Sequence, residues 1–304
     1  MEYVLRTKNL TKAFSSELVV NSVNMNIRKG DIYGFIGKNG AGKTTLMRTI
    51  VGLAVPTSGE IELFESKDLD SQRSKIGTII ESPALYPTYT AKQNLIVQQK
   101  LLLGKVDLKE IDEILKMVGL DDVGNKKAKK FSLGMKQRLA IAIALIGKPE
   151  FLILDEPING LDPTGIKEIR NLILLLNKEH GITVLISSHI LGELSKVVTC
   201  YGVIHNGKLI DEFDAKSLRE RVQSYLEIKV DSTELAGKII EENLNTKNYE
   251  ILENDTIHLY DNIDESSKIN SLLVQNGVTV YSISNFGENY EDYFIKLMEG
   301  QKDD

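Results

Sequence analysis

Short apolar runs and longer amphipathic stretches alternate along residues 1–220. The short runs are rich in Val, Ile and Leu and predict strands, while the longer stretches carry apolar residues at helical spacing and predict helices. The predicted strands cover residues 19–27, 31–37, 76–80, 151–155, 182–187 and 201–210. The predicted helices cover residues 44–53, 91–103, 108–120, 135–147 and 166–180. Strands that alternate with helices indicate an α/β fold, in which crossover helices join the strands of a parallel sheet.

The pattern changes near residue 220. The elements expected after it are a strand at 225–230, a helix at 232–244, strands at 249–253 and 256–260, a helix at 266–277, a strand at 278–284 and a helix at 290–300. The order β-α-β-β-α-β is that of a small ferredoxin-like α+β unit. We therefore expect two domains, residues 1–220 and residues 221–304, the second with an accessory or regulatory role.

Net charge and the length of the apolar runs narrow the class of protein. The net charge is −6 at pH 7, so neither nucleic acid nor an anionic membrane surface is an expected partner. The longest apolar runs fall short of the roughly 18 residues of a membrane-spanning helix, and the first residues lack the apolar segment of a secretory signal. A role at a membrane is therefore expected to need a partner. Cys200 is the only cysteine, which excludes an internal disulfide and fits a reducing compartment.

A glycine-rich segment links the predicted strand 31–37 to the predicted helix 44–53. It reads G-x-x-x-x-G-K-T, the pattern of a P-loop, whose glycines let backbone N–H groups face a phosphate at a helix N-terminus. Lys43 can reach the β- and γ-phosphates of a nucleotide, and the Thr44 hydroxyl can bind Mg²⁺. The expected nucleotide-binding residues of this segment are Gly37, Lys38, Asn39, Gly40, Ala41, Gly42, Lys43, Thr44 and Thr45.

Two acids and a histidine follow two other predicted strands. Asp155 and Glu156 end the apolar run FLIL, and His189 comes just after residues 182–187. The carboxyl ends of the strands in such a sheet form one edge, where ligands bind. We expect Asp155 to bind Mg²⁺, Glu156 to polarise the attacking water, and His189 to hold that water near the γ-phosphate. The candidate catalytic residues are Lys43, Glu156 and His189.

The segment before the predicted helix 135–147 identifies a family. It reads FSLGM and resembles LSGGQ, the signature loop of the ATP-binding cassette (ABC) ATPases. The P-loop, the strand with two acids, the D-loop NGLD (Asn159 to Asp162) and His189 match other motifs of that family, in its order. The resemblance covers roughly residues 3 to 215 and implies a P-loop NTPase cassette with a helical subdomain at about residues 84–140.

The resemblance also implies nucleotide contacts that lie outside the P-loop. Phe14 stands where the family stacks an aromatic ring on adenine. Ser132 and Gly134 match the signature residues that face the γ-phosphate, and Asp162 belongs to the D-loop. The chain departs from the family pattern at Leu133, where a glycine is usual, and at Met135, where a glutamine is usual.

A third departure lies at the end of the predicted strand 76–80. The family usually has a glutamine there, which contacts Mg²⁺ and water and senses the transmembrane partner, whereas this chain has Glu81 followed by the loop 82–87. A carboxylate can bind Mg²⁺ through oxygen but cannot donate a hydrogen bond unless it is protonated. We therefore expect Glu81 to join Thr44 and Asp155 as a metal ligand. The alternative is a neutral replacement of glutamine by glutamate.

The resemblance implies an ATPase subunit that uses ATP and Mg²⁺ and drives a separate transmembrane permease. Two copies would pair head to tail as a homodimer, in the cytoplasm, on the inner face of the cell membrane. An ESPALYP-like loop is similar to that of the bacitracin- and lantibiotic-resistance subgroup, which suggests export of a drug or an antimicrobial peptide. The alternatives are an importer subunit, an exporter of another cargo such as sodium ion or lipid, and an ABC ATPase that acts on DNA or the ribosome.

Overall fold

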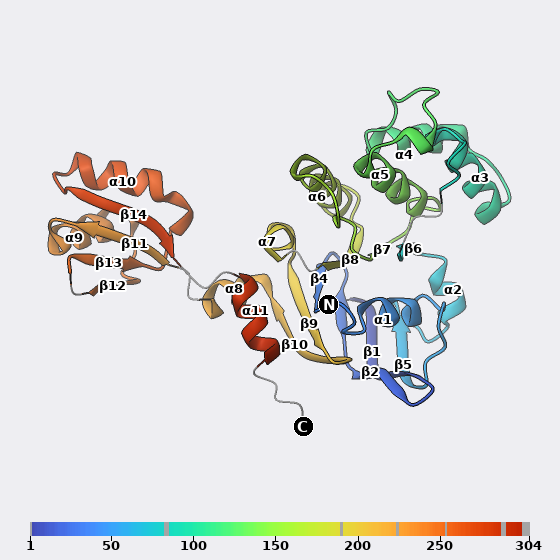
Figure 1. Cartoon of the computed structure of the whole chain (residues 1–304), viewed down its shortest axis with the longest axis horizontal. Coiled ribbons are helices and arrows are strands. Elements are labelled where there is room, and N and C mark those ends of the chain that lie inside the picture. The colour runs from blue at the N-terminus through green and yellow to red at the C-terminus, as the bar shows by residue number, and fades with distance from the viewer. Residues whose placement is uncertain are drawn as a thin grey trace. The chain divides into compact units, whose positions relative to one another are not determined.

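The chain divides into two compact units (Figure 1). The structure is a computed structural model that describes residues 2–81, 85–188, 191–222, 225–252, 254–286 and 290–299. The units comprise Met1–Ala215 and Lys216–Asp304. Each unit has its own buried apolar core, so each is described by itself.

A six-stranded sheet forms the centre of the first unit. Its strand order is β10-β9-β4-β8-β7-β6, with β6, β7, β8, β4 and β9 parallel and β10 antiparallel to β9. Every residue of the three central strands β4, β8 and β7 is buried, which explains why their sequences are continuous apolar runs. The bounds are β4 (Ile32–Ile36), β6 (Ile76–Ile79), β7 (Phe151–Leu154), β8 (Thr183–Ser188), β9 (Cys200–His205) and β10 (Lys208–Asp214).

A second, antiparallel sheet lies in the same unit and differs from the sequence prediction. Strand β1 pairs with β2, β3 and β5, and neither β1 nor β5 was expected. The prediction of a single strand at residues 19–27 is wrong. The segment forms two strands, β2 and β3, which pair with different parts of β1. The bounds are β1 (Tyr3–Phe14), β2 (Glu17–Val23), β3 (Asn26–Arg28) and β5 (Ser58–Leu63).

The single strand predicted at residues 201–210 is also wrong, because it is the hairpin β9–β10. Asn206 and Gly207 form its two-residue turn with φ values of 46° and 76°. Asn-Gly is the pair that favours such a turn, since both residues tolerate positive φ. The turn was therefore readable from the sequence.

In the described part of the first unit, three α-helices lie between β6 and β7 in the chain and pack on one another. These are α3 (Ala91–Leu103), α4 (Leu108–Met117) and α5 (Leu133–Ala144), gathered together in Figure 1. Helix α3 starts with a capping box between Thr90 and Gln93, which satisfies two backbone N–H groups at the helix start. The other elements of this unit are α1 (Lys43–Ile50), α2 (Leu69–Arg73), η1 (Ala128–Lys130), α6 (Pro163–Lys178) and α7 (Leu191–Leu194).

The core of the first unit places helix α1 against both of its sheets. Leu46 and Met47 of α1 are fully buried in one cluster with Leu5 of β1 and Phe35 of β4. Burial of several large apolar side chains holds the helix firmly, at roughly 1.5–3 kcal/mol for each. The loop that precedes α1 is therefore anchored at the edge of the six-stranded sheet.

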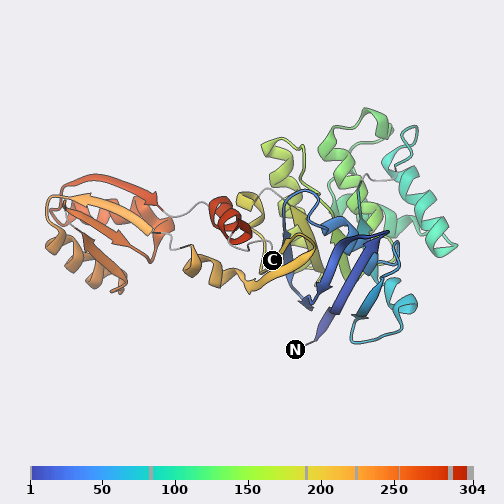
Figure 2. The same ribbon diagram turned by 60° about the horizontal axis from the view of Figure 1, so that its bottom comes forward.

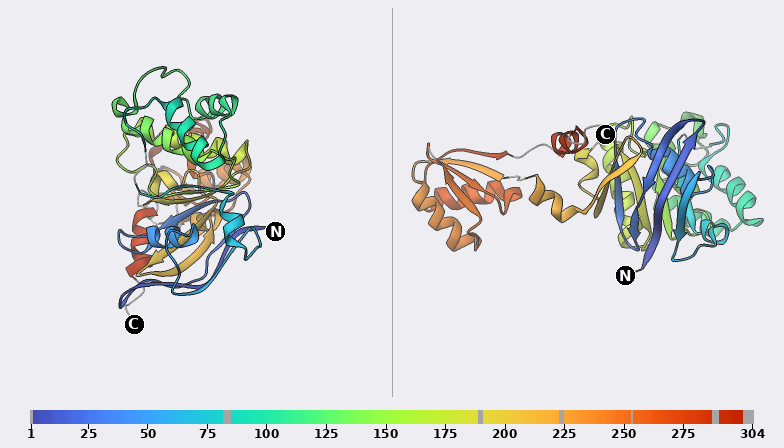
Figure 3. Two further views of the ribbon diagram at one scale, coloured as in Figure 1. Left: turned by 90° about the vertical axis from the view of Figure 1, so that its right-hand side faces the viewer. Right: turned by 90° about the horizontal axis from the view of Figure 1, so that it is seen from below.

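The second unit is a four-stranded antiparallel sheet with two helices on one face, as Figure 2 and the right panel of Figure 3 show. Its strand order is β12-β13-β11-β14, and the element order within it is β-α-β-β-α-β. Leu226 and Ile228 of β11 pack on Ile240 of α9 and Leu273 of α10, which buries that face of the sheet. The bounds are α8 (Ala215–Arg221), β11 (Tyr225–Val230), α9 (Thr233–Leu244), β12 (Tyr249–Leu252), β13 (Thr256–Leu259), η2 (Ile263–Glu265), α10 (Ser266–Gln275), β14 (Val280–Phe286) and α11 (Tyr290–Glu299).

Among the described residues, no helix combines the length and the apolar character that crossing a bilayer requires.

Cys200 lies half-buried at the start of β9. Burial, and then the nearby carboxylates of Glu212 and Asp31, raise the pKa of its thiol from the ordinary value of 9.0 to about 12. Both causes disfavour the negatively charged thiolate, which is the nucleophilic form. The thiol of the folded chain should therefore be unreactive at neutral pH.

We expect native Cys200 to react with iodoacetamide roughly 100-fold or more slowly at pH 8 than the same residue in urea. The native rate should continue to rise tenfold per pH unit beyond pH 9, whereas the rate in urea should level off near the ordinary pKa. Intact-mass measurement of the alkylated fraction over time checks both statements. A native rate that levels off near pH 9 would show that local opening, and not a raised pKa, protects the thiol.

Candidate functional site

The glycine-rich loop of residues 37–42 joins β4 to the N-terminus of α1. Gly42 has φ of 104°, and a Cβ atom there would lie 2.5 Å from the carbonyl oxygen of Val19. Gly40 also has a positive φ, of 83°. A side chain at Gly42 would be both strained and blocked, so the loop needs glycine there to turn its backbone toward a ligand.

The turn between β9 and β10 is hydrogen-bonded to the glycine-rich loop, a contact that was not predicted from the sequence. The Gly207 N–H donates to the Ala41 carbonyl at 3.1 Å, and the Asn21 N–H of β2 donates to the Gly207 carbonyl at 2.8 Å. A Cβ atom at Gly37 would lie 2.6 Å from the Ile204 carbonyl oxygen. Strands far apart in the sequence thus hold the loop in its conformation.

Lys43 is buried at the start of α1, with 6% of its side chain exposed. Its ammonium group donates to the carbonyl oxygens of Gly37 at 2.6 Å and Lys38 at 3.3 Å, and lies 3.7 Å from Glu156 Oε1. A buried ammonium group is stable only when acceptors surround it. The loop carbonyls and the carboxylate therefore hold the positive charge within the loop.

Thr44 and Asp155 meet at the carboxyl ends of β4 and β7. The Thr44 hydroxyl donates to Asp155 Oδ2 at 2.7 Å, and the Asp155 side chain is 7% exposed. The Asp155 N–H donates to the Ile79 carbonyl at 2.8 Å, which joins the segment after β7 to the end of β6. The two candidate metal ligands thus present oxygen atoms side by side.

Ser187, at the end of β8, connects the two acids. Its hydroxyl donates to Asp155 Oδ1 at 2.6 Å and accepts a hydrogen bond from the Glu156 N–H at 2.8 Å. Glu156 has φ of 49°, a conformation that costs energy for a residue other than glycine, and this hydrogen bond helps to hold it. This role of Ser187 was not predicted from the sequence. The signal was present, since a buried hydroxyl at the end of an apolar strand needs partners.

Glu81 follows β6 and forms an ion pair that the sequence did not predict. Its Oε1 atom lies 2.7 Å from Nη2 of Arg48 in α1, with 58% of the glutamate and 43% of the arginine side chain exposed. Glu81 has φ of 63°. The described contact of this carboxylate is therefore with an arginine. Residues 82–84 of the loop after it lie outside the described residues.

The signature-like segment starts helix α5. The Ser132 hydroxyl accepts a hydrogen bond from the Met135 N–H at 3.2 Å and so caps the helix. Leu133 is half-exposed, and its Cδ2 atom lies 3.4 Å from the position of a Cβ built on Gly160 in the D-loop. The leucine that stands in place of the usual glycine thus lies against Gly160 of the same chain. Gly134 follows within the first turn of α5.

The other candidate residues lie at the ends of their elements. Phe14 ends β1, is half-exposed and has the Lys12 ammonium group 4.6 Å from its ring centre. The Asp162 carboxylate accepts from the Gly165 N–H at 3.1 Å and caps α6. His189 lies outside the described residues. The structure thus brings together Lys43, Thr44, Asp155 and Glu156, while Phe14, Ser132 and Asp162 make their described contacts elsewhere. Lys38 and Asn39 lie in the loop, and Thr45 lies in the first turn of α1.

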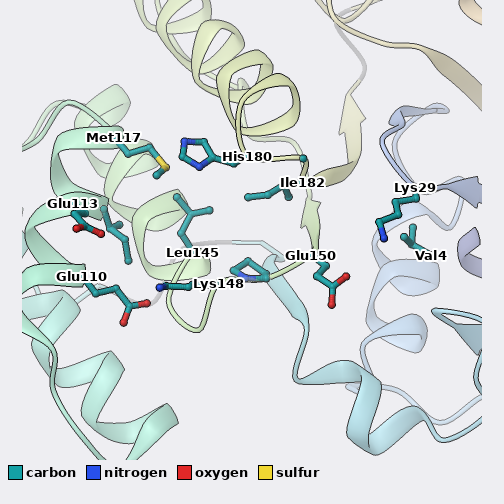
Figure 4. Close-up of a pocket in the computed structure, with 13 residues that line it drawn as sticks. Val4, Lys29, Glu110, Glu113, Met117, Leu145, Lys148, Glu150, His180 and Ile182 are labelled. Carbon is teal, nitrogen blue, oxygen red and sulfur yellow. The ribbon is translucent and has the colours of Figure 1, made fainter. Parts of the chain in front are cut away.

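A cavity of about 540 Å³ lies away from these residues, at the start of β7 and β8 (Figure 4). Glu110, Glu113 and Met117 of α4 are on one side of it, and Lys29 and Val4 are on the other. Nucleotide loops follow the carboxyl ends of parallel strands, and this cavity borders their amino ends. Acidic and basic side chains mix around it, which does not suit a triphosphate.

Comparison with known proteins places the chain in a family. The family model described as ABC transporter matches residues 20–159. The bacitracin transport ATP-binding protein BcrA of Bacillus licheniformis is 44% identical over 303 residues, which are 99% of this chain and 99% of the relative. The chain belongs to the ABC transporter family. The resemblance seen in the sequence motifs is confirmed.

Two further ABC proteins define the extent of the likeness. The lantibiotic transport ATP-binding protein SrtF of Streptococcus pyogenes is 47% identical over 211 residues, which are 69% of this chain and 90% of SrtF. A solved structure, a dimeric ATP-binding cassette in a post-hydrolysis state bound to ADP and Pi, aligns with a TM-score of 0.63 at 28% identity. The alignment covers 69% of this chain and 98% of the solved chain. The predicted α/β cassette fold is thus confirmed.

Proposed function

We propose that this chain is the ATP-binding and ATP-hydrolysing subunit of an ABC transporter that exports a drug or an antimicrobial peptide. The observation that carries the proposal is the connected group at the sheet edge. Thr44, Asp155, Ser187 and Glu156 form one hydrogen-bonded chain, and Lys43 contacts Glu156. These are the groups that phosphoryl transfer requires, because its catalysis is mostly positioning and charge stabilisation.

The nucleotide is bound by the loop and the helix that follows it. Backbone N–H groups of residues 37–42 and the N-terminus of α1 face the phosphates, and Lys43 exchanges its carbonyl partners for phosphate oxygens. Phe14 stacks on the adenine, which its exposed ring permits. Thr45 extends the row of donors in the first turn of the helix.

Mg²⁺ fits the oxygen atoms of Thr44 and Asp155. Within the described part of the chain there is no cluster of three or more His, Cys, Asp or Glu that could hold a metal. Mg²⁺ at phosphoryl-transfer sites uses one or two protein oxygens together with phosphates and water, and Thr44 and Asp155 supply two. The metal neutralises charge on the phosphates when it is bound. Glu81 is the third candidate ligand.

Hydrolysis depends on Glu156 as the residue that polarises water. Its carboxylate stands beside the Lys43 ammonium group, and its backbone is tied to β8 through Ser187. A carboxylate fixed in this way can orient the attacking water and accept its proton. His189, which lies outside the described residues, is the candidate for holding the same water near the γ-phosphate.

The assembly is a head-to-tail homodimer that drives a separate transmembrane permease. Ser132 and Gly134 of one copy, with Asp162 of its D-loop, would close over the nucleotide that the other copy's loop holds, so each site is composite. The solved cassette named above is itself described as dimeric. The complex would lie in the cytoplasm on the inner face of the membrane, with no nucleic acid as partner.

The domain boundaries proposed are residues 1–220 for the cassette, with a helical subdomain at about 84–140, and residues 221–304 for an accessory domain. The element order and the strand order of the second unit are those of a ferredoxin-like fold, which supports that assignment. Fold does not assign function here, so regulation and dimer stabilisation are both open roles.

The proposed cargo is a peptide antibiotic of the bacitracin or lantibiotic kind. The relative named for bacitracin transport matches this chain over its whole length, whereas the lantibiotic relative matches over 69% of it. Full-length similarity includes the second unit, so bacitracin is the better-supported cargo. Sodium ion or lipid export is the alternative.

Deletion of the gene in its host should increase sensitivity to bacitracin several-fold, and the wild-type gene should restore resistance. Lys43→Ala should not restore it, because the variant lacks the charge that binds the phosphates. Lys67→Ala is the matched control, since Lys67 is an exposed lysine that pairs with Glu60. Unchanged resistance to bacitracin and lantibiotics, with altered tolerance of sodium, would replace the proposed cargo. Growth at graded peptide concentrations measures the effect.

A further inference from the structure

We propose that Arg48 is a positioning residue that keeps the Glu81 carboxylate paired until nucleotide and Mg²⁺ are bound, and then releases it to the metal. The inference rests on the proposed function, because it assigns the pair a place in the same nucleotide site. Its geometric basis is the ion pair between Arg48 Nη2 and Glu81 Oε1, which are 2.7 Å apart.

Helix geometry places Arg48 next to the metal ligand Thr44. The two residues are four positions apart in α1, so they lie on one face of the helix, about one turn apart. Long side chains of a helix lean toward its N-terminus, over the preceding turn. This tendency favours a position of the Arg48 guanidinium near the turn that holds Thr44, and the Glu81 carboxylate is paired with that guanidinium.

Strand pairing places Glu81 near the same point from the other side. Strand β6 is parallel to β7, and the Ile79 carbonyl accepts the Asp155 N–H at 2.8 Å. Glu81 is only two residues beyond that hydrogen bond. Glu81 is thus tied to α1 through Arg48 and follows the strand end that is bonded to Asp155.

Pairing with Arg48 changes the charge that Glu81 presents to a bound nucleotide. An unpaired carboxylate beside the phosphates of a nucleotide would repel them in the absence of metal. Arg48 neutralises that carboxylate in the resting chain, and Mg²⁺ offers it a stronger partner once the nucleotide brings the metal in. An exposed ion pair is weak, so it can be exchanged without a large barrier. The substitution of a glutamate for the usual glutamine is thereby linked to the arginine.

The test measures how strongly Mg²⁺ tightens binding of ADP, a probe that the chain does not hydrolyse. The quantity is the ratio of the Kd for ADP in EDTA to the Kd for ADP in saturating Mg²⁺, obtained by calorimetry on the full chain. Arg48→Gln frees Glu81 to repel the nucleotide without metal and to join the metal shell with it. We expect this ratio to rise by roughly two- to fivefold, the range of an exposed ion pair. Arg48→Lys keeps the charge and should leave it near the wild-type value.

The control for a direct effect of Arg48 on the phosphates is the same substitution in a Glu81→Gln background. There the ratio should not respond to Arg48→Gln, since the carboxylate is gone. Arg6→Gln is the matched surface control. Arg6 is 40% exposed and pairs with Glu62 at 3.1 Å on the antiparallel sheet of the first unit. An equal rise in both Glu81 backgrounds, or no rise in either, would overturn the inference. If wild-type chain binds ADP without any response to Mg²⁺, the proposed metal site itself fails instead.

Discussion

Glu156→Gln should lower steady-state ATP hydrolysis by about 100-fold or more while ATP binding persists. The amide has nearly the shape of the carboxylate, but it cannot accept the proton of the attacking water. The hydrogen bond from the Glu156 N–H to Ser187 involves the backbone and survives the substitution. The carbonyl oxygens that Lys43 contacts in the absence of nucleotide belong to Gly37 and Lys38 and are not changed by the substitution, so the phosphate site should remain formed.

Three measurements on purified chain check this result: phosphate release, equilibrium binding of ATP, and the size of the complex with ATP. The variant should accumulate as an ATP-loaded dimer, because hydrolysis is what reopens the pair. Glu150→Gln is the matched control, since Glu150 immediately precedes β7, at the end opposite Glu156, and pairs with Lys75 at the surface. Turnover of Glu156→Gln near the wild-type rate would assign the water-polarising role to another residue.

Ser132→Arg should abolish hydrolysis without weakening ATP binding to the isolated chain. Ser132 is exposed and makes its described hydrogen bond at the start of α5, away from the phosphate loop of its own chain. A bulky cation there would prevent the segment from closing over the nucleotide of the other copy. Loss of the cap also costs about 1 kcal/mol of helix stability, which a thermal melt would register.

The control for cap loss is Ser232→Arg. Ser232 caps α9 in the second unit by accepting the Leu235 N–H, so the same substitution removes a comparable cap far along the chain. It should leave turnover close to wild type. For the wild-type chain, activity per molecule should rise with concentration as dimers form. Activity strictly proportional to concentration at every dilution, or full turnover in Ser132→Arg, would argue against composite sites.

The nucleotide loop and its neighbouring strands were readable from the sequence because their requirements are local. Gly40 and Gly42 take positive φ, which few other residues tolerate, so the glycine spacing encodes the loop directly. The apolar runs of β4, β7 and β8 are buried on both faces, and continuous apolar runs predict such strands. Each run ends where the sheet ends, which brought Asp155 and Glu156 to one edge in the prediction and in the structure.

The antiparallel sheet of the first unit could not be predicted from the sequence, because the alternation of apolar and polar residues along its strands is weak. Strand β1 mixes buried residues with charged ones such as Arg6 and Lys8, and it exchanges partners between β2, β3 and β5. Alternation identifies a strand only when one face stays buried along its length. The break within residues 19–27 likewise follows from that change of partner, which is a long-range property.

By itself, the sequence determined the fold class, the family and the residues of the phosphate loop, because these depend on glycine spacing, apolar runs and short motifs. Only the tertiary structure decided which side chains meet across long separations. Ser187 joins Asp155 to Glu156, Gly207 supports Ala41, and Arg48 pairs with Glu81. The physical reason is that a hydrogen bond or ion pair between distant residues leaves no periodic trace in either segment, whereas burial imposes its period on every residue of a strand or helix.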